Sequence, residues 1–258
     1  MSIYEHFRRE EHPFVDQVLE WKRTVTEQYR PRLTDFLDPR QRTIVRSLIG
    51  KQEDVNCDFN GGAEQAERKR CLLFPAYFVP ERSDFETAVF EMQYPSKFVK
   101  LEHRNILGAL MNIGLKREKF GDILSDGSRF QVIVAEEVAD FVQWNLTSVG
   151  KANVSLHHVS DEKDVLHVES DTLLQQVTVS SLRLDAIVAE AHHLSRSKAK
   201  PLIESGLVKV NWKVISDPGF QLQESDVISV RGKGRCELKS NEGNTKKGKW
   251  RITLGFPK

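Results

Sequence analysis

The chain has 258 residues, of which 39% are hydrophobic and 29% are charged, and its formal net charge is +1. This length predicts about two domains, and the composition predicts a globular protein with a real core. No apolar run approaches the ~18 residues of a membrane span, and the charged N-terminus lacks the apolar centre of a signal peptide. We therefore expect a cytoplasmic protein without membrane contact.

The charges are distributed unevenly along the chain. Residues 183–258 hold fifteen Lys and Arg against eight Asp and Glu, whereas residues 1–182 hold twenty-three against twenty-nine. A basic end on an acidic body is typical of an electrostatic binding surface, and it modestly favours a nucleic-acid partner. The three cysteines are far apart and form no CxxC pair, so neither a zinc site nor a disulfide framework is expected.

Residues 1–80 are predicted to form a mainly helical N-terminal domain. Apolar residues recur near helical spacing in residues 14–25. A second helix is predicted in residues 34–50, because Asp38 can cap it and Pro39 suits its first turn.

Residues 81–165 are predicted to form a middle domain, just after a strand expected at residues 71–79. Its expected elements, in chain order, are a strand, a helix, a hairpin, a helix and a strand at residues 85–94, 102–115, 121–135, 136–149 and 152–160. The inward face of the first helix is expected to consist of Ile106, Leu107, Leu110 and Met111. This order predicts a split α/β sandwich, the ferredoxin-like arrangement that RNA-recognition domains share. The fold alone does not give the function.

The rest of the chain is divided into a polar, acidic linker at residues 166–180 and a C-terminal domain at residues 181–258. In that domain we expect a helix from near Ser181, a second helix that ends at Gly206, and a strand, tight turn and strand in residues 207–215.

The hairpin in residues 207–215 alternates apolar and polar side chains. Its apolar face is expected to consist of Leu207, Val208, Val210 and Val214, and its polar face of Lys209, Asn211 and Lys213. A further strand ends at residue 238, a flexible polar loop is expected at residues 239–249, and a closing strand at residues 249–256 is expected to pair with residues 234–238.

The sequence contains none of the common catalytic motifs HExxH, GxxxxGK[ST], GxGxxG after a strand or GxSxG. His157 and His158 lie together on a predicted strand, so they face opposite sides and cannot bind one metal. Residues 61–62 predict a turn rather than a phosphate loop, because no Lys-Ser/Thr follows. We therefore expect no enzyme activity, no metal and no cofactor.

Residues 194–214 contain the most informative cluster of cations. Ser195 can cap a helix that carries Arg196, Lys198 and Lys200 near its start. A helix N-terminus already presents unpaired N–H groups and positive potential, so added cations make a phosphate site. A merely solvated helix would more often carry acids in that turn.

Residues 181–238 resemble the S4 RNA-binding domain. The matching residues are Arg183-Leu184-Asp185, Ser195-Arg196, Lys198, Ala199, Leu202-Ile203, Gly206, Val208, Val210-Asn211, Asp226 and Ile228. Two residues depart from the pattern. Trp212 stands where many members have Gly, so it either stacks on a base or lies on the protein surface. Pro201 lies inside the second helix, where it would kink the helix or delay its start.

The resemblance implies the following RNA contacts: Arg183, Ser195, Arg196, Lys198, Lys200, Lys209, Asn211 and Lys213, with Trp212 as a stacking candidate. Charge and neighbouring glycines add Arg231, Lys233 and Arg235 at the rim. Arg183 and Asp185 have a second interpretation, an internal ion pair. Lys116, Arg117 and Lys119 form either a second RNA patch or a complement to the dipole of the preceding helix.

The whole chain resembles the YlmH family of Gram-positive bacteria and cyanobacteria, which is encoded near cell-division genes. The resemblance rests on LTDFLDPRQ, GGAEQAERKR, LGALMNIGLKREKFGDIL and the terminal domain. It implies a helical N-terminal part, an RRM-like middle domain and a C-terminal S4 domain of the αL type. It also implies binding to large-subunit ribosomal RNA and to tRNA, peptidyl-tRNA among them, in ribosome-associated quality control of stalled translation.

These observations together predict a monomer that binds structured RNA by charge and shape. Two alternatives stay open. The first is an RNA-modifying enzyme, since S4 domains are often attached to pseudouridine synthases and methyltransferases, although no glycine-rich nucleotide loop is seen. The second is a cell-division adaptor that binds proteins through the acidic N-terminal part.

Overall fold

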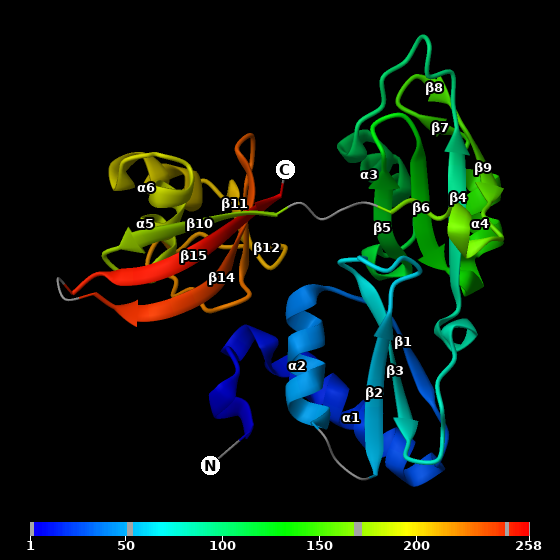
Figure 1. Cartoon of the computed structure of the whole chain (residues 1–258), viewed down its shortest axis with the longest axis horizontal. Helices are drawn as coiled ribbons and strands as arrows, with labels where there is room; N and C mark the ends of the chain where they lie inside the picture. Colours follow the sequence, from blue (N-terminus) through cyan, green and yellow to red (C-terminus); the bar gives the residue numbers. More distant parts are fainter. Residues whose placement is uncertain (1–2, 51–53, 168–171, 246–247, 258) are drawn as a thin grey trace. The chain divides into compact units, whose positions relative to one another are not determined.

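The computed structural model describes residues 3–50, 54–167, 172–245 and 248–257. The chain divides into two compact units, a first unit at residues 1–169 and a second unit at residues 170–258. Both units mix helices and strands, so the predicted α+β class is confirmed (Figure 1). No helix among the described residues is long and apolar enough to cross a membrane.

The first unit begins with an N-terminal part in which two helices accompany a three-stranded antiparallel sheet. The helices are α1 (His12–Gln28) and α2 (Pro39–Ile49), after the short 3-10 helices η1 (Ile3–His6) and η2 (Arg9–Glu11). The strands, in the sheet order β1-β3-β2, are β1 (Arg32–Leu37), β3 (Lys69–Pro75) and β2 (Val55–Asn60). Both predicted helices are present, but the second begins at Pro39 and not at residue 34, because residues 34–37 belong to β1. Strand β3 corresponds to the strand expected at residues 71–79. The sequence did not predict β1 and β2.

Helix α2 begins at the cap that the sequence indicates. Asp38 Oδ1 accepts a hydrogen bond from the Gln41 N–H at 2.8 Å, and Gln41 Oε1 accepts one from the Asp38 N–H at 2.9 Å. This reciprocal pair is a capping box. The buried face of α2 packs with α1 and the sheet, and it consists of Ile44, Val45, Leu48 and Ile49.

The middle part of the first unit contains the predicted order of elements. The main elements are β4 (Thr87–Gln93), α3 (His103–Asn112), β5 (Phe120–Ser125), β6 (Phe130–Ala135), α4 (Ala139–Asn145) and β9 (Ser155–His158). A small hairpin of β7 (Ser148–Val149) and β8 (Ala152–Asn153) lies between α4 and β9 in the sequence. The short 3-10 helices are η3 (Arg82–Phe85), η4 (Arg117–Lys119), η5 (Glu136–Val138) and η6 (Glu162–Asp164). The sheet order is β5-β6-β4-β9, with every neighbouring pair antiparallel. Each helix therefore connects two strands that flank a third, as in a split βαβ unit.

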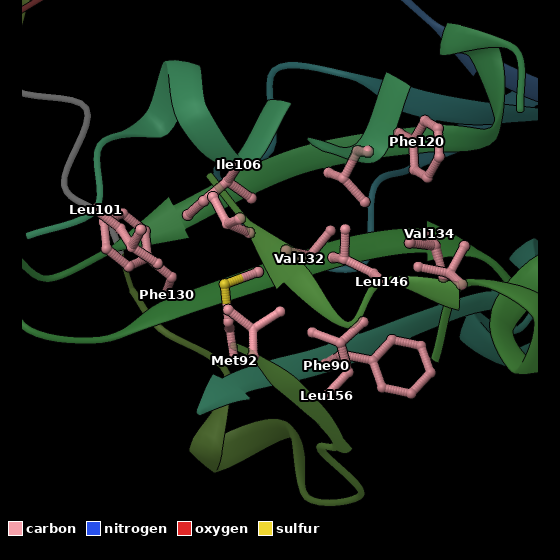
Figure 2. Close-up of a cluster of buried hydrophobic side chains, with 14 of the residues drawn as sticks. Phe90, Met92, Leu101, Ile106, Phe120, Phe130, Val132, Val134, Leu146 and Leu156 are labelled. Atoms are coloured by element: carbon pink, nitrogen blue, oxygen red, sulfur yellow. The ribbon is translucent and has the colours of Figure 1, made fainter. Parts of the chain in front are cut away.

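Helices α3 and α4 cover one face of this sheet and enclose its main core (Figure 2). Ile106 and Leu110 of α3 are fully buried there, next to Phe90 and Val132. Met111 was expected to face inward, but it is 38% exposed. It lies one position beyond Leu110, at the edge of the apolar stripe, because the helix turns by about 100° per residue.

The opposite face of the same sheet is also buried. Val89, Leu124 and Ile133 point to that side and pack in a second cluster with Phe36 of β1 and with residues 165–166. Side chains alternate between the two faces along a strand, so both sides of β4 and β6 are closed. The aromatic-rich open sheet of a typical RNA-recognition domain is therefore not available in the first unit.

Arg68 and Arg70 join the N-terminal and middle parts of the first unit. Arg68 is 6% exposed, and it donates hydrogen bonds to the carbonyl oxygens of Phe36 at 2.7 Å and Phe120 at 3.2 Å. Arg70 is also buried, and its Nη1 lies 3.0 Å from Glu137 Oε2. Because these partners come from both parts, the basic end of GGAEQAERKR is a structural bridge.

Gly62 lies in the turn that the sequence predicts before this bridge. Its φ is +81°, and an added Cβ would lie 2.8 Å from Cγ2 of the buried Ile133. We expect Gly62→Ala to reduce the free energy of unfolding by about 2–4 kcal/mol, from backbone strain and overpacking together. Urea denaturation measures this change.

Gly127 provides a matched control for Gly62. Its φ is +91°, but an added Cβ there would meet no atom within 4 Å. Gly127→Ala should therefore cost only the backbone strain, about 1–2 kcal/mol. Equal costs at the two positions would contradict the packing argument for Gly62.

The described residues of the second unit form two helices and one six-stranded antiparallel sheet. The helices are α5 (Leu184–Ala191) and α6 (Arg196–Glu204). The strands, in the order β10-β15-β14-β13-β11-β12, are β10 (Thr172–Val179), β15 (Trp250–Pro257), β14 (Gly234–Asn244), β13 (Val227–Val230), β11 (Val208–Val210) and β12 (Lys213–Val214). The helices pack on the sheet through one apolar core.

Two segments of the second unit correct the sequence-based boundaries. Residues 172–179 were assigned to the linker, but they form β10 and pair along their whole length with β15. Residues 239–244 were assigned to a flexible loop, but they continue β14 through two register shifts. The predicted pairing of β15 with residues 234–238 is confirmed for Glu237 and Leu238, whereas residues 234–236 pair with β13. The remainder of the predicted linker and loop includes residues 168–171 and 246–247, which lie outside the described residues.

Candidate RNA interface

The corner between α5 and α6 holds three charged side chains together. Asp185, at the start of α5, is 6% exposed. Its Oδ1 lies 3.1 Å from Arg183 Nε, and its Oδ2 lies 2.7 Å from Arg196 Nη2. The ion pair that the sequence offered as a second interpretation of Arg183 is therefore present. The contact to Arg196 was not predicted, and it fixes the first residue of α6 to α5.

Both arginine side chains of this corner keep about half of their surface in solvent. The exposed fraction of the side chain is 40% for Arg183 and 50% for Arg196. Burial raises the pKa of Asp185, but hydrogen bonds and charges from the two arginines outweigh burial, and the net shift is downward. The carboxylate therefore orients two guanidinium groups that can still contact a ligand.

The lowered pKa of Asp185 makes the stability of the second unit depend on pH. Because the folded-state pKa lies below the unfolded value of ~3.9, the ion pairs stabilise the fold above that pH and are lost as the pH falls through the folded-state pKa. We expect Asp185→Asn to lower the free energy of unfolding by about 1–2 kcal/mol at pH 7, and this difference to shrink as the pH falls through the folded-state pKa of Asp185. Urea titrations at pH 7 and at acidic pH measure this.

Glu204→Gln is the matched control for Asp185→Asn. Glu204 lies 3.6 Å from Lys200 on the surface of α6, and half of its side chain is exposed. Exposed pairs of this kind contribute about 0–1 kcal/mol. If Asp185→Asn cost no more than this control, or cost the same at both pH values, the structural role of Asp185 would be wrong.

Helix α6 presents its cations from the first turn onward. Ser195 is at the N-cap position, but its hydroxyl contacts the Ser197 hydroxyl at 2.8 Å and does not cap the helix. Arg196, Lys198 and Lys200 are all exposed. The helix is assigned without a break through Pro201, so the expected late start is not seen.

The tight turn between β11 and β12 is formed by two residues with positive φ, Asn211 at +48° and Trp212 at +65°. Lys209 pairs with Val214, and Val210 pairs with Lys213. Opposite residues of a hairpin share one face, so this two-residue turn places Lys209 and Lys213 on different faces. Val214, which was expected inside, is 51% exposed for the same reason.

Asn211 and Trp212 have different surroundings. The Asn211 side chain donates to Asp226 Oδ1 at 2.8 Å and accepts from the Val227 N–H at 2.9 Å. Asn211 therefore holds the turn to β13 through its side chain, and its RNA contact stays a prediction. Trp212 is 37% exposed, which leaves part of its ring accessible for stacking.

The turn between β13 and β14 carries the three rim candidates. Arg231 and Lys233 are exposed, and Arg235 is half-buried. The Arg231 N–H donates to the Leu207 carbonyl at 2.9 Å, so this turn lies beside the C-terminal end of α6. Burial lowers the pKa of His192, and the charge of Lys233 lowers it further, which places Lys233 near the end of α5.

The second predicted patch, Lys116, Arg117 and Lys119, is mostly engaged within the first unit. Arg117 donates to the Phe120 carbonyl at 2.6 Å, and burial lowers its pKa to about 10. Lys119 Nζ lies 2.6 Å from Asp35 Oδ1 and also pairs with Glu137. Lys119 therefore joins β1 to the middle part, whereas Arg117 is held within the middle part. Of the three cations, Lys116 is the exposed one. The chain around them is η4, beyond the end of α3, so they do not complement the dipole of that helix.

The described residues contain no group of three or more His, Cys, Asp and Glu side chains that could hold a metal ion. At the candidate interface the sequence analysis named Asp185 as a partner of Arg183 and missed its contact with Arg196. The contact of Asp185 with Arg196 spans eleven residues and two helices, and no local spacing indicates it.

Comparison with known proteins divides the chain into the N-terminal part, the middle part and the second unit that are described above. Three family models match, described as "YlmH, N-terminal" at residues 10–78, "Putative RNA-binding domain in YlmH" at residues 80–163 and "S4 domain" at residues 182–228. The description of the model for the middle part names an RNA-binding domain. A pseudouridine synthase of Bacillus subtilis, "Ribosomal large subunit pseudouridine synthase B", is 46% identical over 50 residues, which are 19% of this chain and 20% of that protein.

Two further relatives match much more of the chain. "Ribosome-associated protein quality control protein P2" of Bacillus subtilis is 53% identical over 253 residues, which are 98% of each chain. The solved structure of "Cell division protein ylmH from Streptococcus pneumoniae" is 36% identical with a TM-score of 0.55, and the match covers 64% of this chain and 100% of that one. Identity of this level over almost the whole length, together with the three family models, establishes that the chain belongs to the YlmH family.

Proposed function

We propose that the protein binds structured RNA of the large ribosomal subunit together with tRNA, and that it acts in quality control of stalled translation. The proposal is supported by the 53% identical relative that is named for ribosome-associated protein quality control. It is further supported by the S4 domain and by the basic charge of residues 183–258. We propose that the protein does this as a monomer in the cytoplasm.

One observation of the second unit carries the proposal. Arg183 and Arg196 are oriented by the buried Asp185 and remain half exposed, and Lys198 is exposed in the same turn of α6. Oriented cations at a helix N-terminus suit phosphate groups. An A-form RNA helix is recognised mainly through its backbone and shape, so this corner needs no reading of bases.

The modifying-enzyme alternative has little support. The similarity to the synthase covers about one fifth of either chain and falls in the S4 region. That region is the binding module here, and its Asp185 is used to hold two arginines.

A cell-division adaptor is the second candidate, and it is favoured by the Streptococcus pneumoniae relative, which is named as a cell division protein. Such an adaptor would bind its partners through protein contacts. Affinity capture of the protein from lysate, with and without RNase, separates the two candidates. An adaptor keeps its partners after RNase treatment, whereas an RNA-bound factor loses the ribosomal proteins.

The experiment that tests the main proposal is a sucrose gradient of lysate from the native host, probed for this protein at low and high salt. Co-migration with free large subunits that disappears at high salt is the expected result, because phosphate contacts are salt-dependent. Migration at the top of the gradient in both conditions would contradict the proposal.

A further inference from the structure

The middle part of the first unit matches a model described as an RNA-binding domain, but both faces of its sheet are covered. One reason for this closure is Gln131, which is 1% exposed. Its amide donates to the Asp164 carbonyl at 2.8 Å and accepts from the Leu166 N–H at 2.8 Å, so the segment after β9 is tied across the sheet. Any RNA contact of this part must use a surface outside the sheet.

The connection between β4 and α3 is the strongest candidate for that surface (Figure 1). It projects beyond the end of the sheet. Phe98, at its centre, is 88% exposed, more than any other large hydrophobic side chain among the described residues. Burial of such a side chain would stabilise the folded state by about 1.5–3 kcal/mol, but the fold does not bury it.

The exposed position of Phe98 is fixed by the turn around it. The N–H groups of Phe98 and Val99 both donate to the Pro95 carbonyl, at 3.0 and 3.1 Å. On one side of the turn, the Tyr94 ring packs against Phe130 at 6.1 Å between centroids. On the other side, Val99 packs against the main core. The residues that flank Phe98 are thus anchored, and Phe98 is held in solvent.

The charges around Phe98 are mainly positive. Lys97 and Lys100 are both exposed. Arg104 pairs with Glu102 at 2.7 Å, and Arg129 pairs with Asp126 at 3.0 Å in the neighbouring turn between β5 and β6. The two acids are balanced by the two arginines, so the lysines give the loop a net positive charge.

We propose that the loop of residues 94–100 is a binding site for single-stranded RNA, in which Phe98 stacks on an unpaired base and Lys97 and Lys100 contact the flanking phosphates. Aromatic stacking requires a base that is not already stacked in a helix, whereas the corner of α5 and α6 suits duplex backbone. The inference rests on the proposed RNA-binding function, and it assigns the two units to two kinds of RNA structure.

The charge of the surroundings favours RNA over a protein partner for Phe98. Trp144 of α4 is a second large exposed aromatic, 78% exposed, but exposed acids precede it in the sequence, at Glu136 and Asp140. A polyanion is attracted to the surroundings of Phe98 and repelled by those acids. Trp144 therefore provides a matched control.

The test uses the full chain and two fluorescein-labelled probes, a twelve-nucleotide oligouridine and a blunt RNA duplex of twelve base pairs. Phe98→Ala should weaken oligouridine binding by about 5- to 100-fold, the loss of one base–aromatic stack, and should leave duplex binding unchanged. Lys97→Gln/Lys100→Gln should reduce the slope of log K against log salt for oligouridine by about 1.4. Trp144→Ala should change neither probe.

The outcomes separate this inference from the proposed function. If Phe98→Ala left the affinity for oligouridine unchanged, the inference would be overturned, and Phe98 would then be assigned to a contact with another protein. Duplex binding would still support the proposed function in that case. An equal loss in Trp144→Ala would also overturn it. The proposed function would be contradicted by a different result, namely an affinity for the duplex that is unchanged in Arg196→Ala/Lys198→Ala. Because Phe98 is almost fully exposed, Phe98→Ala should fold normally, which a urea transition verifies.

Discussion

Arg68→Met is expected to lower the free energy of unfolding of the first unit by about 2–4 kcal/mol. Methionine fills a similar volume but donates no hydrogen bond. The Phe36 carbonyl would lose the donor that Arg68 provides at 2.7 Å, and the Phe120 carbonyl would lose one of its two donors and keep Arg117. The carboxylate of Asp122, which accepts from the Arg68 N–H, would also lose a nearby cation.

Urea denaturation measures this effect, with Trp21 as the probe of the first unit because it is buried between the helices of that unit. Arg23→Met is the control, since 64% of the Arg23 side chain is exposed and its partner Glu20 lies on the same surface. Such a surface change should stay within about 0.5 kcal/mol. If the two variants lost equal stability, Arg68 would not be the bridge between the two parts.

The sequence predicted the elements whose signals are local. The cap at Asp38 and the apolar spacing of α2 lie within one short segment, and both are present in the structure. The order of strands and helices in the middle part was also predictable, because each element carries its own periodicity. The S4 region was recognised from spacings that span less than sixty residues.

The elements that the sequence did not predict depend on partners outside their own segment. Strand β1 is short and is stabilised by pairing with β3, whose residue Leu73 lies opposite Arg32. Residues 239–244 are polar and look like a loop, but β15 provides the hydrogen bonds that make them a strand. Polar strands with one face in solvent carry no apolar alternation, so periodicity does not find them.

The candidate site was predictable as a set of cations, and less so as a geometry. Local pattern found Arg196 and Lys198, which are exposed on α6. It did not find that Asn211 is occupied by Asp226 and Val227, because hydrogen-bond partners are set by the folded sheet. Arg117 was taken for a surface cation, but it is half-buried and donates to the Phe120 carbonyl.

Arg196→Ala/Lys198→Ala is expected to weaken binding to large ribosomal subunits by about 10- to 100-fold and to reduce the slope of log K against log salt by about 2. Both side chains are exposed at the start of α6, and each lost phosphate contact removes about one unit from the slope. Sedimentation binding with purified subunits, at three or more salt concentrations, measures both quantities.

Two further variants separate the loss of charge at the site from other effects. Arg23→Ala/Arg30→Ala removes the same charge from exposed positions of the first unit and should leave the slope unchanged. Arg196→Lys/Lys198→Arg keeps the charge and should keep the slope, although lysine replaces the guanidinium that contacts Asp185 at 2.7 Å. An unchanged slope in the alanine double variant would show that α6 does not contact phosphates. Equal losses in both alanine double variants would show that binding follows net charge alone, and the corner of α5 and α6 would then have no special role in RNA recognition.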